Sequence, residues 1–169
     1  YSPERVNSMA SRLGIIPGAS LDLTTNDSDG RPWDFNDPVM RERAIKLVRE
    51  RKCMLLIGSP MCTAFSRLQN INFKKMSPDR VREIIIHGLR HLEFCMYLYR
   101  IQHEQGLYFL HEHPASATSW KAWQVQEIMN LPGVQRVTAD MCAFGMIQQD
   151  ELGVGLIKKP TSFMSNSAE

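Results

Sequence analysis

Two polar segments of this 169-residue chain carry residue types that can do covalent chemistry. Cys62 lies in the segment Gly58–Ser66, and Glu112 lies in the segment His111–Pro114. A cysteine thiolate is a strong nucleophile near neutral pH, and a carboxyl group can stabilise the charge that its attack creates. We therefore expect a nucleophilic site if the fold brings the two segments together. The competing interpretation is that Cys62 is a small buried hydrophobic residue.

Both segments directly follow short apolar runs. Cys53–Ile57 precedes the first segment, and Leu107–Leu110 precedes the second. Apolar runs of this length are typical of strands that are buried on both faces of a parallel sheet. Because ligand sites in such sheets lie beyond the carboxyl ends of the strands, we expect the thiol and the carboxyl to face one crevice.

Helical patterns separate these strands. Apolar residues recur at helical spacing in Pro38–Arg51, and Ser77 followed by proline and aspartate opens a second helix that stops at Gly106. The alternation of helices and short strands predicts an α/β fold with a mostly parallel sheet flanked by helices. The other expected elements are helices at Pro3–Leu13 and Ser119–Met129 and strands at Ser20–Thr24, Gly133–Thr138 and Pro160–Met164.

Composition limits the class of protein. With 43% hydrophobic and 22% charged residues, the chain is expected to form one globular domain at 1–164, followed by a tail at 165–169. No apolar stretch approaches the roughly 20 residues of a membrane span, so we expect no membrane contact. The net charge of +2 does not argue for nucleic acid. Four widely spaced cysteines predict a reducing, intracellular compartment, and a chain that opens on Tyr1 is interpreted as a piece of a longer polypeptide.

Several motifs together resemble one known family. The segment GSPMCTAFS at 58–66 resembles the G-x-P-P-C-Q-x-F-S catalytic loop of C5-cytosine DNA methyltransferases, and EHP at 112–114 resembles their E-N-V element. Met61, Thr63 and His113 replace the family's proline, glutamine and asparagine. Cys142–Gly145 resembles the family's tyrosine-glycine turn. The chain as a whole is also similar to methyltransferase-like segments of protist retroelement polyproteins.

The resemblance implies a Rossmann-like, S-adenosylmethionine-dependent methyltransferase fold, truncated at its first strand and without a target-recognition domain. The implied reaction moves a methyl group from S-adenosylmethionine to C5 of cytosine in DNA, with RNA open as a second substrate. Cys62 would form the covalent adduct and Glu112 would act at N3. The implied location is intracellular, the nucleus included.

The segment 65–76 is expected to be irregular, and it could close over the DNA backbone. The resemblance also implies which residues contact the cofactor and the nucleic acid. No metal is expected. The implied cofactor contacts are Ser2, Glu4, Asp22, Asp34 and Pro60, and the implied nucleic-acid contacts are Ser66, Arg67, Lys74 and Lys75.

Other interpretations stay open. The chain could be a catalytically inactive methyltransferase-like module that binds nucleic acid or protein, or a thiol hydrolase that uses Cys62 with His111 or His113 as base. An amino-methyltransferase is less consistent, because the residues at 59–62 lack the aromatic of its motif. We expect His111 and His113 to point to opposite sides of their strand and to share no metal, although His113 could join Cys62 and Cys142 around zinc.

Overall fold

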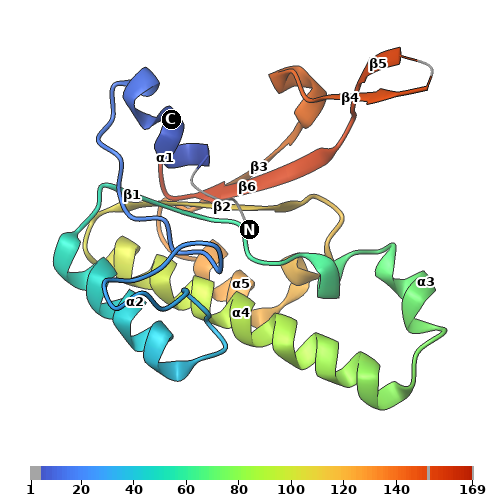
Figure 1. The fold of residues 1–169 in the computed structure, drawn as a ribbon, viewed down its shortest axis with the longest axis horizontal. Coiled ribbons are helices and arrows are strands. Elements are labelled where there is room, and N and C mark those ends of the chain that lie inside the picture. The colour runs from blue at the N-terminus through green and yellow to red at the C-terminus, as the bar shows by residue number, and fades with distance from the viewer. Residues whose placement is uncertain (1–4, 152, 169) are drawn as a thin grey trace.

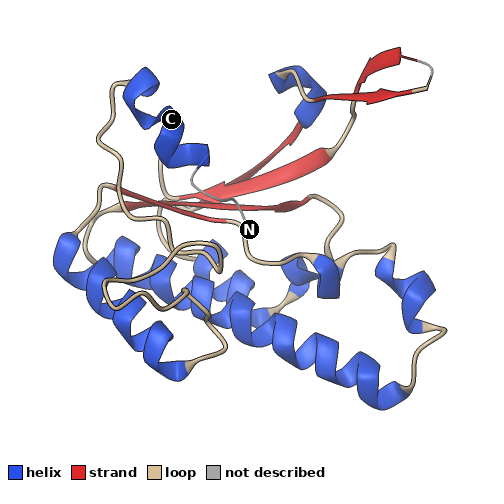
Figure 2. Ribbon diagram, in the orientation of Figure 1, coloured by secondary structure: helices blue, strands red, loops and turns tan. Residues whose placement is uncertain are grey.

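The computed structural model describes residues 5–151 and 153–168. Figure 1 and Figure 2 show a sheet with α2, α4 and α5 packed below one face, α1 above the other, and a separate hairpin projecting from one end. The helices are α1 (Arg5–Ala10), α2 (Pro38–Arg51), α3 (Gln69–Phe73), α4 (Pro78–Glu104) and α5 (Trp123–Met129). The strands are β1 (Leu55–Gly58), β2 (Tyr108–Pro114), β3 (Gln135–Asp140), β4 (Ile147–Asp150), β5 (Gly153–Leu156) and β6 (Pro160–Ser165). Single 3-10 turns are η1 (Ser11–Leu13), η2 (Thr63–Phe65), η3 (Thr118–Lys121) and η4 (Met141–Phe144).

The predicted mostly parallel, Rossmann-like sheet is wrong. The four-stranded sheet has the order β1-β2-β6-β3, in which β1 and β2 are parallel while β6 is antiparallel to both β2 and β3. The hairpin of β4 and β5 forms a second, two-stranded antiparallel sheet. Hydrophobic patterns indicate where strands lie but not their direction. Here the chain leaves β3, passes through the hairpin and returns as β6 beside it, without a crossover helix, so the pairing is antiparallel.

Two further expectations differ from the structure. Ser20–Thr24 forms a turn, not a strand, because Asp22 Oδ1 accepts hydrogen bonds from the backbone N and Oγ1 of Thr24. Short polar side chains that bond to their own backbone favour turns over strands. The segment 65–76, expected to be irregular, begins at the last residue of η2 and contains the short helix α3.

Helix α4 begins where its sequence predicts. Ser77 Oγ accepts a hydrogen bond from the backbone N of Arg80 at 3.3 Å, and Pro78 occupies the first turn. Ser77 thus satisfies an amide that would otherwise lack a partner, and the proline needs none. Helix α2 uses the same device, with Asp37 accepting from the backbone N of Val39 at 2.8 Å.

The core has two parts that meet at α4. One part lies between the sheet and helices α4 and α5, and the other lies between α2 and α4. Gln102 of α4 is fully buried, and its Nε2 donates to the carbonyls of Cys53 and Tyr108, which precede and begin the two parallel strands. The largest side chains that are fully buried include Met40, Leu92, Tyr99, Phe109, Ile128 and Met164.

Within residues 5–151 and 153–168, no helix combines the length and the apolar character needed to cross a membrane.

Candidate functional site

The Cys62 segment follows β1 at the same end of the sheet at which Glu112 lies in β2. The parallel register aligns Leu55 with Tyr108 and Gly58 with His111, so the carboxyl ends of both strands share one edge. The two strand ends are neighbours, as the sequence predicts, whereas a crevice shared by the thiol and the carboxyl stays a prediction. The register places the thiol-bearing segment and the acid-bearing strand end in neighbouring positions.

Two glycines allow the Cys62 segment to pack tightly. A Cβ on Gly58 would lie 2.0 Å from Oη of Tyr99, and a Cβ on Gly88 of α4 would lie 2.5 Å from Cβ of Ala64. Real Cβ atoms do not approach other atoms this closely, so both positions require glycine. Ala64 and Phe65 of η2 are buried, and η2 therefore packs directly on α4.

A hydrogen bond fixes the other side of η2. Thr118 Oγ1 donates to the carbonyl of Phe65 at 3.3 Å, and the Phe65 ring contacts the His113 ring edge-on with centroids 6.0 Å apart. Cys62 lies at the N-terminal end of η2, makes no side-chain hydrogen bond to its backbone and is partly buried. Its position is therefore set by α4, β2 and η3 together, and not by the segment alone.

His111 and His113 lie side by side on the buried face of β2. Their ring centroids are 5.4 Å apart, and both side chains are almost fully buried. The expectation that they would point to opposite sides was wrong, because side chains two residues apart on a strand share a face. Both rings face helix α4 and η3, away from solvent.

Each histidine has one hydrogen-bonded ring nitrogen. His111 Nδ1 lies 3.2 Å from Oη of Tyr99, and His113 Nδ1 lies 2.5 Å from Oγ of Ser119. Both Nε2 atoms are buried without a hydrogen-bond partner among the described residues. The sequence interpretation missed Tyr99 and Ser119, because nothing local links either of them to a histidine 6 or 12 positions away.

Burial sets the protonation of both rings. It lowers the pKa of His111 to about 3, with His113 as a second cause, and it lowers the pKa of His113 to about 4 against the opposing effect of the Pro60 carbonyl. Both imidazoles are neutral near pH 7 and are weak bases. Among the described residues, no hydrogen bond joins Cys62 to either ring, which disfavours a cysteine hydrolase.

Glu112 points away from the histidines. It pairs with Phe163 of β6 on the opposite, open face of the sheet and is partly exposed. No hydrogen bond or ion pair links Glu112 to Cys62 in the part of the chain that the structure describes. The fold thus brings the two segments to one edge without a direct contact between the two side chains.

The implied cofactor residues do not form a shared site. Ser2 and Glu4 lie outside the described residues. Asp22 is buried, and its Oδ1 is occupied by two hydrogen bonds from Thr24, at 2.9 and 2.7 Å. Asp34 Oδ1 accepts two hydrogen bonds from Asn36 in the turn before α2.

These carboxylates therefore stabilise the turns in which they lie. The nearby Trp33 is buried in the core between α2 and α4, so its ring is not free to stack on an adenine. Pro60 lies beside His113, at the edge of the sheet. The described residues implied as contacts consequently do not fit a binding site for S-adenosylmethionine.

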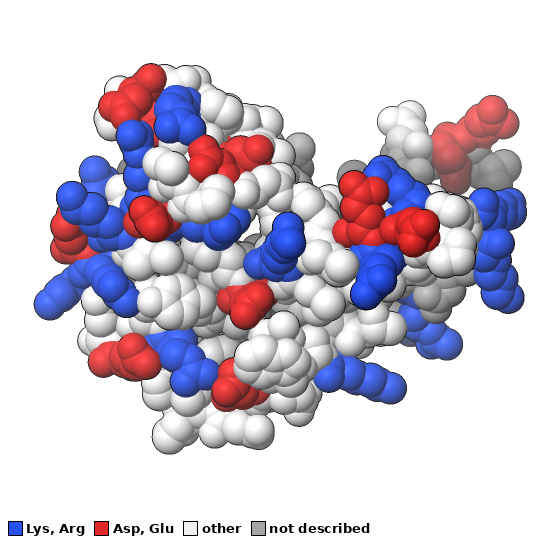
Figure 3. Space-filling view, turned by 90° about the horizontal axis from the view of Figure 1, so that it is seen from below, with Lys and Arg blue, Asp and Glu red and all other residues white. Residues whose placement is uncertain are grey.

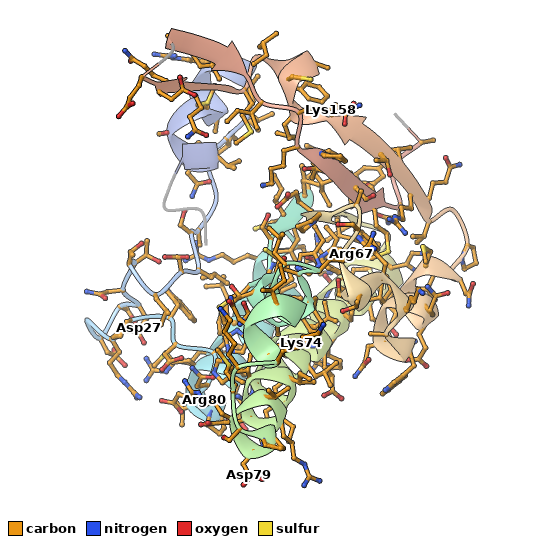
Figure 4. The ribbon with its side chains drawn as sticks, turned by 90° about the vertical axis from the view of Figure 1, so that its right-hand side faces the viewer. Asp27, Arg67, Lys74, Asp79, Arg80 and Lys158 are labelled. Atoms are coloured by element: carbon orange, nitrogen blue, oxygen red, sulfur yellow. The ribbon has the colours of Figure 1, made fainter. Side chains whose placement is uncertain are left out.

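The implied nucleic-acid contacts lie on the projecting end formed by α3 and the start of α4. Figure 4 shows Arg67 and Lys74 on the side of the molecule that faces the viewer, and Figure 3 shows Lys and Arg interspersed with Asp and Glu across the helix side. Ser66 Oγ accepts from the backbone N of Leu68. Within the described residues, Arg67, Lys74 and Lys75 form no ion pair.

No metal centre is assembled from the described residues, since they contain no group of three His, Cys, Asp or Glu side chains able to hold an ion. The zinc set of His113, Cys62 and Cys142 is thus not formed. All four cysteines are free thiols. Burial raises the pKa of Cys95 to about 12, in keeping with a residue that only packs in the core.

Comparisons with known proteins found no match to any family model, to any curated protein or to any solved structure. The fold and the site describe a mixed α/β domain. Its partly buried Cys62 follows the carboxyl end of one strand of a parallel pair.

Proposed function

We propose that this chain is the catalytic part of a protein that methylates C5 of cytosine in DNA through a covalent adduct with Cys62. The observation that carries the proposal is the parallel pairing of β1 and β2, which puts the Cys62 segment and the Glu112 strand end at one edge. The resemblance of positions 58–66 and 112–114 to the methyltransferase motifs supports the same assignment.

The proposed chemistry begins at C6 of the base. The Cys62 thiolate forms a bond to C6, and the electron pair displaced from the C5–C6 double bond makes C5 nucleophilic. Glu112 donates a hydrogen bond or proton at N3, where negative charge develops. A base in a duplex must leave the stack to reach these groups. Loss of the C5 proton and of the thiolate restores the double bond after transfer.

S-adenosylmethionine is the proposed methyl donor, since it supplies an electrophilic methyl group. The described residues do not fit its site, so we assign it no contact and route no step through it. On the DNA side, Arg67, Lys74 and Lys75 would contact phosphates, with Ser66 beside them, and binding would weaken as salt is raised.

A covalent trapping assay tests the nucleophile. The probe is a random-sequence duplex pool containing 2-pyrimidinone deoxynucleotides, which accept a thiol at C6 without any methyl donor. We expect an adduct that survives denaturing electrophoresis, that is lost in Cys62→Ser and that is retained in the matched control Cys53→Ser. An adduct in Cys62→Ser, or none in the wild type, would contradict the proposal.

Glu112 is tested by rate. Removing one group that stabilises a transition state costs about 10²–10³ in rate, so Glu112→Gln should slow trapping by that factor. An unchanged rate would remove Glu112 from the site. A separate assay tests the methyl donor. Cytosine duplexes are incubated with the protein and S-adenosylmethionine, and methyl incorporation into the DNA is measured.

A second candidate is an inactive nucleic-acid-binding module. It is favoured by the hydrogen bonds that engage Oδ1 of Asp22 and of Asp34 in their own turns, away from the role of contacts to a methyl donor. DNA binding that persists without any adduct, and that weakens in Lys74→Ala, would support this candidate over the enzyme.

A further inference from the structure

An apolar groove lies at the projecting end of the molecule, between α3 and the start of α4. Its volume is about 570 Å³, within the range of about 300–1,000 Å³ that ligand pockets span. Two cationic residues line it, Lys74 and Arg82, and none of the described acidic residues does. The apolar residues that line it are Phe73, Met76, Pro78, Val81, Ile85 and Ile86. We call this hollow the α3–α4 groove.

A sharp turn between the two helices forms the groove. The backbone N of Lys75 donates to the carbonyl of Asn72 at 2.9 Å, and the backbone N of Met76 donates to the carbonyl of Phe73 at 3.2 Å. The groove residues of α4, between 78 and 86, recur at the spacing of one helix face. They span about 12 Å at about 1.5 Å per residue, which matches about two turns of a helix laid along them.

The lining of the groove is open to solvent. Ile86 is 42% exposed and Met76 is 37% exposed. Contiguous apolar surface with charged residues at its rim marks interaction sites on soluble proteins. An occupant that fills the groove must therefore present apolar side chains of its own.

Positive charge is concentrated around the groove. Residues 66–90 hold six cationic and two acidic residues, a net charge of +4, whereas the whole chain carries +2. Glu83, one of the two acids, pairs with Arg80 at 2.6 Å. The other, Asp79, lies in the first turn of α4, where the positive end of the helix dipole stabilises it. Neither acid lines the groove.

The two cations of the groove are free to bind an acid. Among the residues that the structure describes, neither Lys74 nor Arg82 forms an ion pair, and Lys75 forms none either. Figure 4 shows Lys74 on the same side of the molecule as Asp79 and Arg80. A carboxylate of an occupant would therefore meet unpaired positive charge at the rim of an apolar lining.

We propose that the α3–α4 groove binds an acidic amphipathic helix of another protein. Apolar side chains over about two turns of that helix fill the groove, and carboxylates beside them pair with Lys74 and Arg82. Nucleic acid matches the charge of the groove, but its phosphates and sugars leave the apolar lining unfilled. The proposal does not rest on the proposed catalysis, because Cys62 and Glu112 lie outside the groove.

Fluorescence anisotropy with a labelled synthetic peptide tests the groove. The probe is a helix-forming peptide of about 16 residues, with leucines at positions i, i+3, i+4 and i+7 and glutamates on both sides of that stripe. We expect saturable binding to the wild-type chain with a dissociation constant below about 100 µM. Replacing the leucines of the peptide by serine, or its glutamates by lysine, should each weaken binding by about 10-fold or more.

Variants of the protein locate the binding site. Ile86→Asp puts a charge into the apolar lining and should weaken binding by about 10-fold or more. The matched control Val39→Asp changes a helical residue that is 45% exposed and lies outside the groove, and it should leave binding unchanged. Arg82→Glu reverses an exposed charge and should weaken binding by about 5-fold or more at low salt. Circular dichroism checks that each variant is folded.

Three results would overturn the proposal. They are no saturable binding of the acidic peptide to the wild type, equal binding of the peptide without leucines, and unchanged binding in folded Ile86→Asp and Arg82→Glu. A labelled DNA duplex is measured in the same way, and DNA that binds where the peptide does not would assign the cations to nucleic acid. Because Arg82 is exposed, its variant decides the question even if Ile86→Asp does not fold.

Discussion

Substitution of Gly58 by alanine tests how the Cys62 segment is anchored. The added methyl carbon would lie 2.0 Å from Oη and 3.0 Å from Cζ of Tyr99. Tyr99 has little room to move, since it is 1% exposed, stacks on Phe109 with centroids 4.8 Å apart and has its hydroxyl 3.2 Å from His111 Nδ1. The substitution must therefore displace either the tyrosine or the end of β1.

The cost has two parts. Overpacking a well-packed core costs about 1–3 kcal/mol, and a buried hydroxyl that loses its hydrogen bond costs about 1–3 kcal/mol. We take about 3 kcal/mol for Gly58→Ala. In a chain of this length each kcal/mol lowers Tm by roughly 2–4 °C, so Tm should fall by about 6–12 °C.

Urea and thermal denaturation of Gly58→Ala, Tyr99→Phe and the double variant measure this cost. Removing Oη leaves the nearest ring atom 3.0 Å from the new methyl carbon, so the double variant should be more stable than the sum of the two single effects by at least about 1 kcal/mol. Gly155→Ala, at a strand glycine with open space around its Cβ, is the control and should change stability by less than about 0.5 kcal/mol. Additive effects, or a Gly58→Ala variant as stable as the wild type, would refute the reasoning.

Three other predictions follow from the same structure. Gly88→Ala would bring a methyl carbon 2.5 Å from Ala64 Cβ, so it should loosen η2 and speed alkylation of Cys62 several-fold, as measured by mass spectrometry. The free energy of unfolding should fall between pH 7 and pH 5 in urea titrations, by about 2 kcal/mol for each buried histidine, because the unfolded chain binds protons below about pH 6.5 while folded His111 and His113 stay neutral down to about pH 3 and 4. Asp37→Ala removes the cap of α2 and should cost about 1 kcal/mol in the same titrations.

Each of these has an outcome that contradicts it. Unchanged alkylation in Gly88→Ala would mean that α4 does not hold η2. Equal stability at pH 7 and pH 5, or a His113→Gln variant with the wild-type pH dependence, would mean that the rings are not buried as neutral groups. Asp37→Ala should cost more than Arg31→Ala, which removes the exposed ion pair but keeps the cap, and equal losses would assign the effect to that pair.

The sequence by itself determined the elements that depend on neighbouring residues. The start of α4 at Ser77 and Pro78, the capped start of α2, and strands near Leu55 and Tyr108 were predictable, because caps and short apolar runs act within a few positions. A glycine inside a helical pattern, here Gly88, also indicates that another segment packs closely on the helix at that position. The sequence did not predict that this segment contains Ala64.

Tertiary structure decided what depends on distant residues. The antiparallel direction of β6 arises from pairing with residues 20 or more positions away, which no local pattern encodes. The burial of His111 and its bond to Tyr99 likewise require helix α4 to pack on β2. Asp22 has the residue type of a ligand contact, yet the turn it stabilises occupies its carboxylate. Residue type can suggest a chemical role, but the surrounding packing determines whether the side chain is free to perform it.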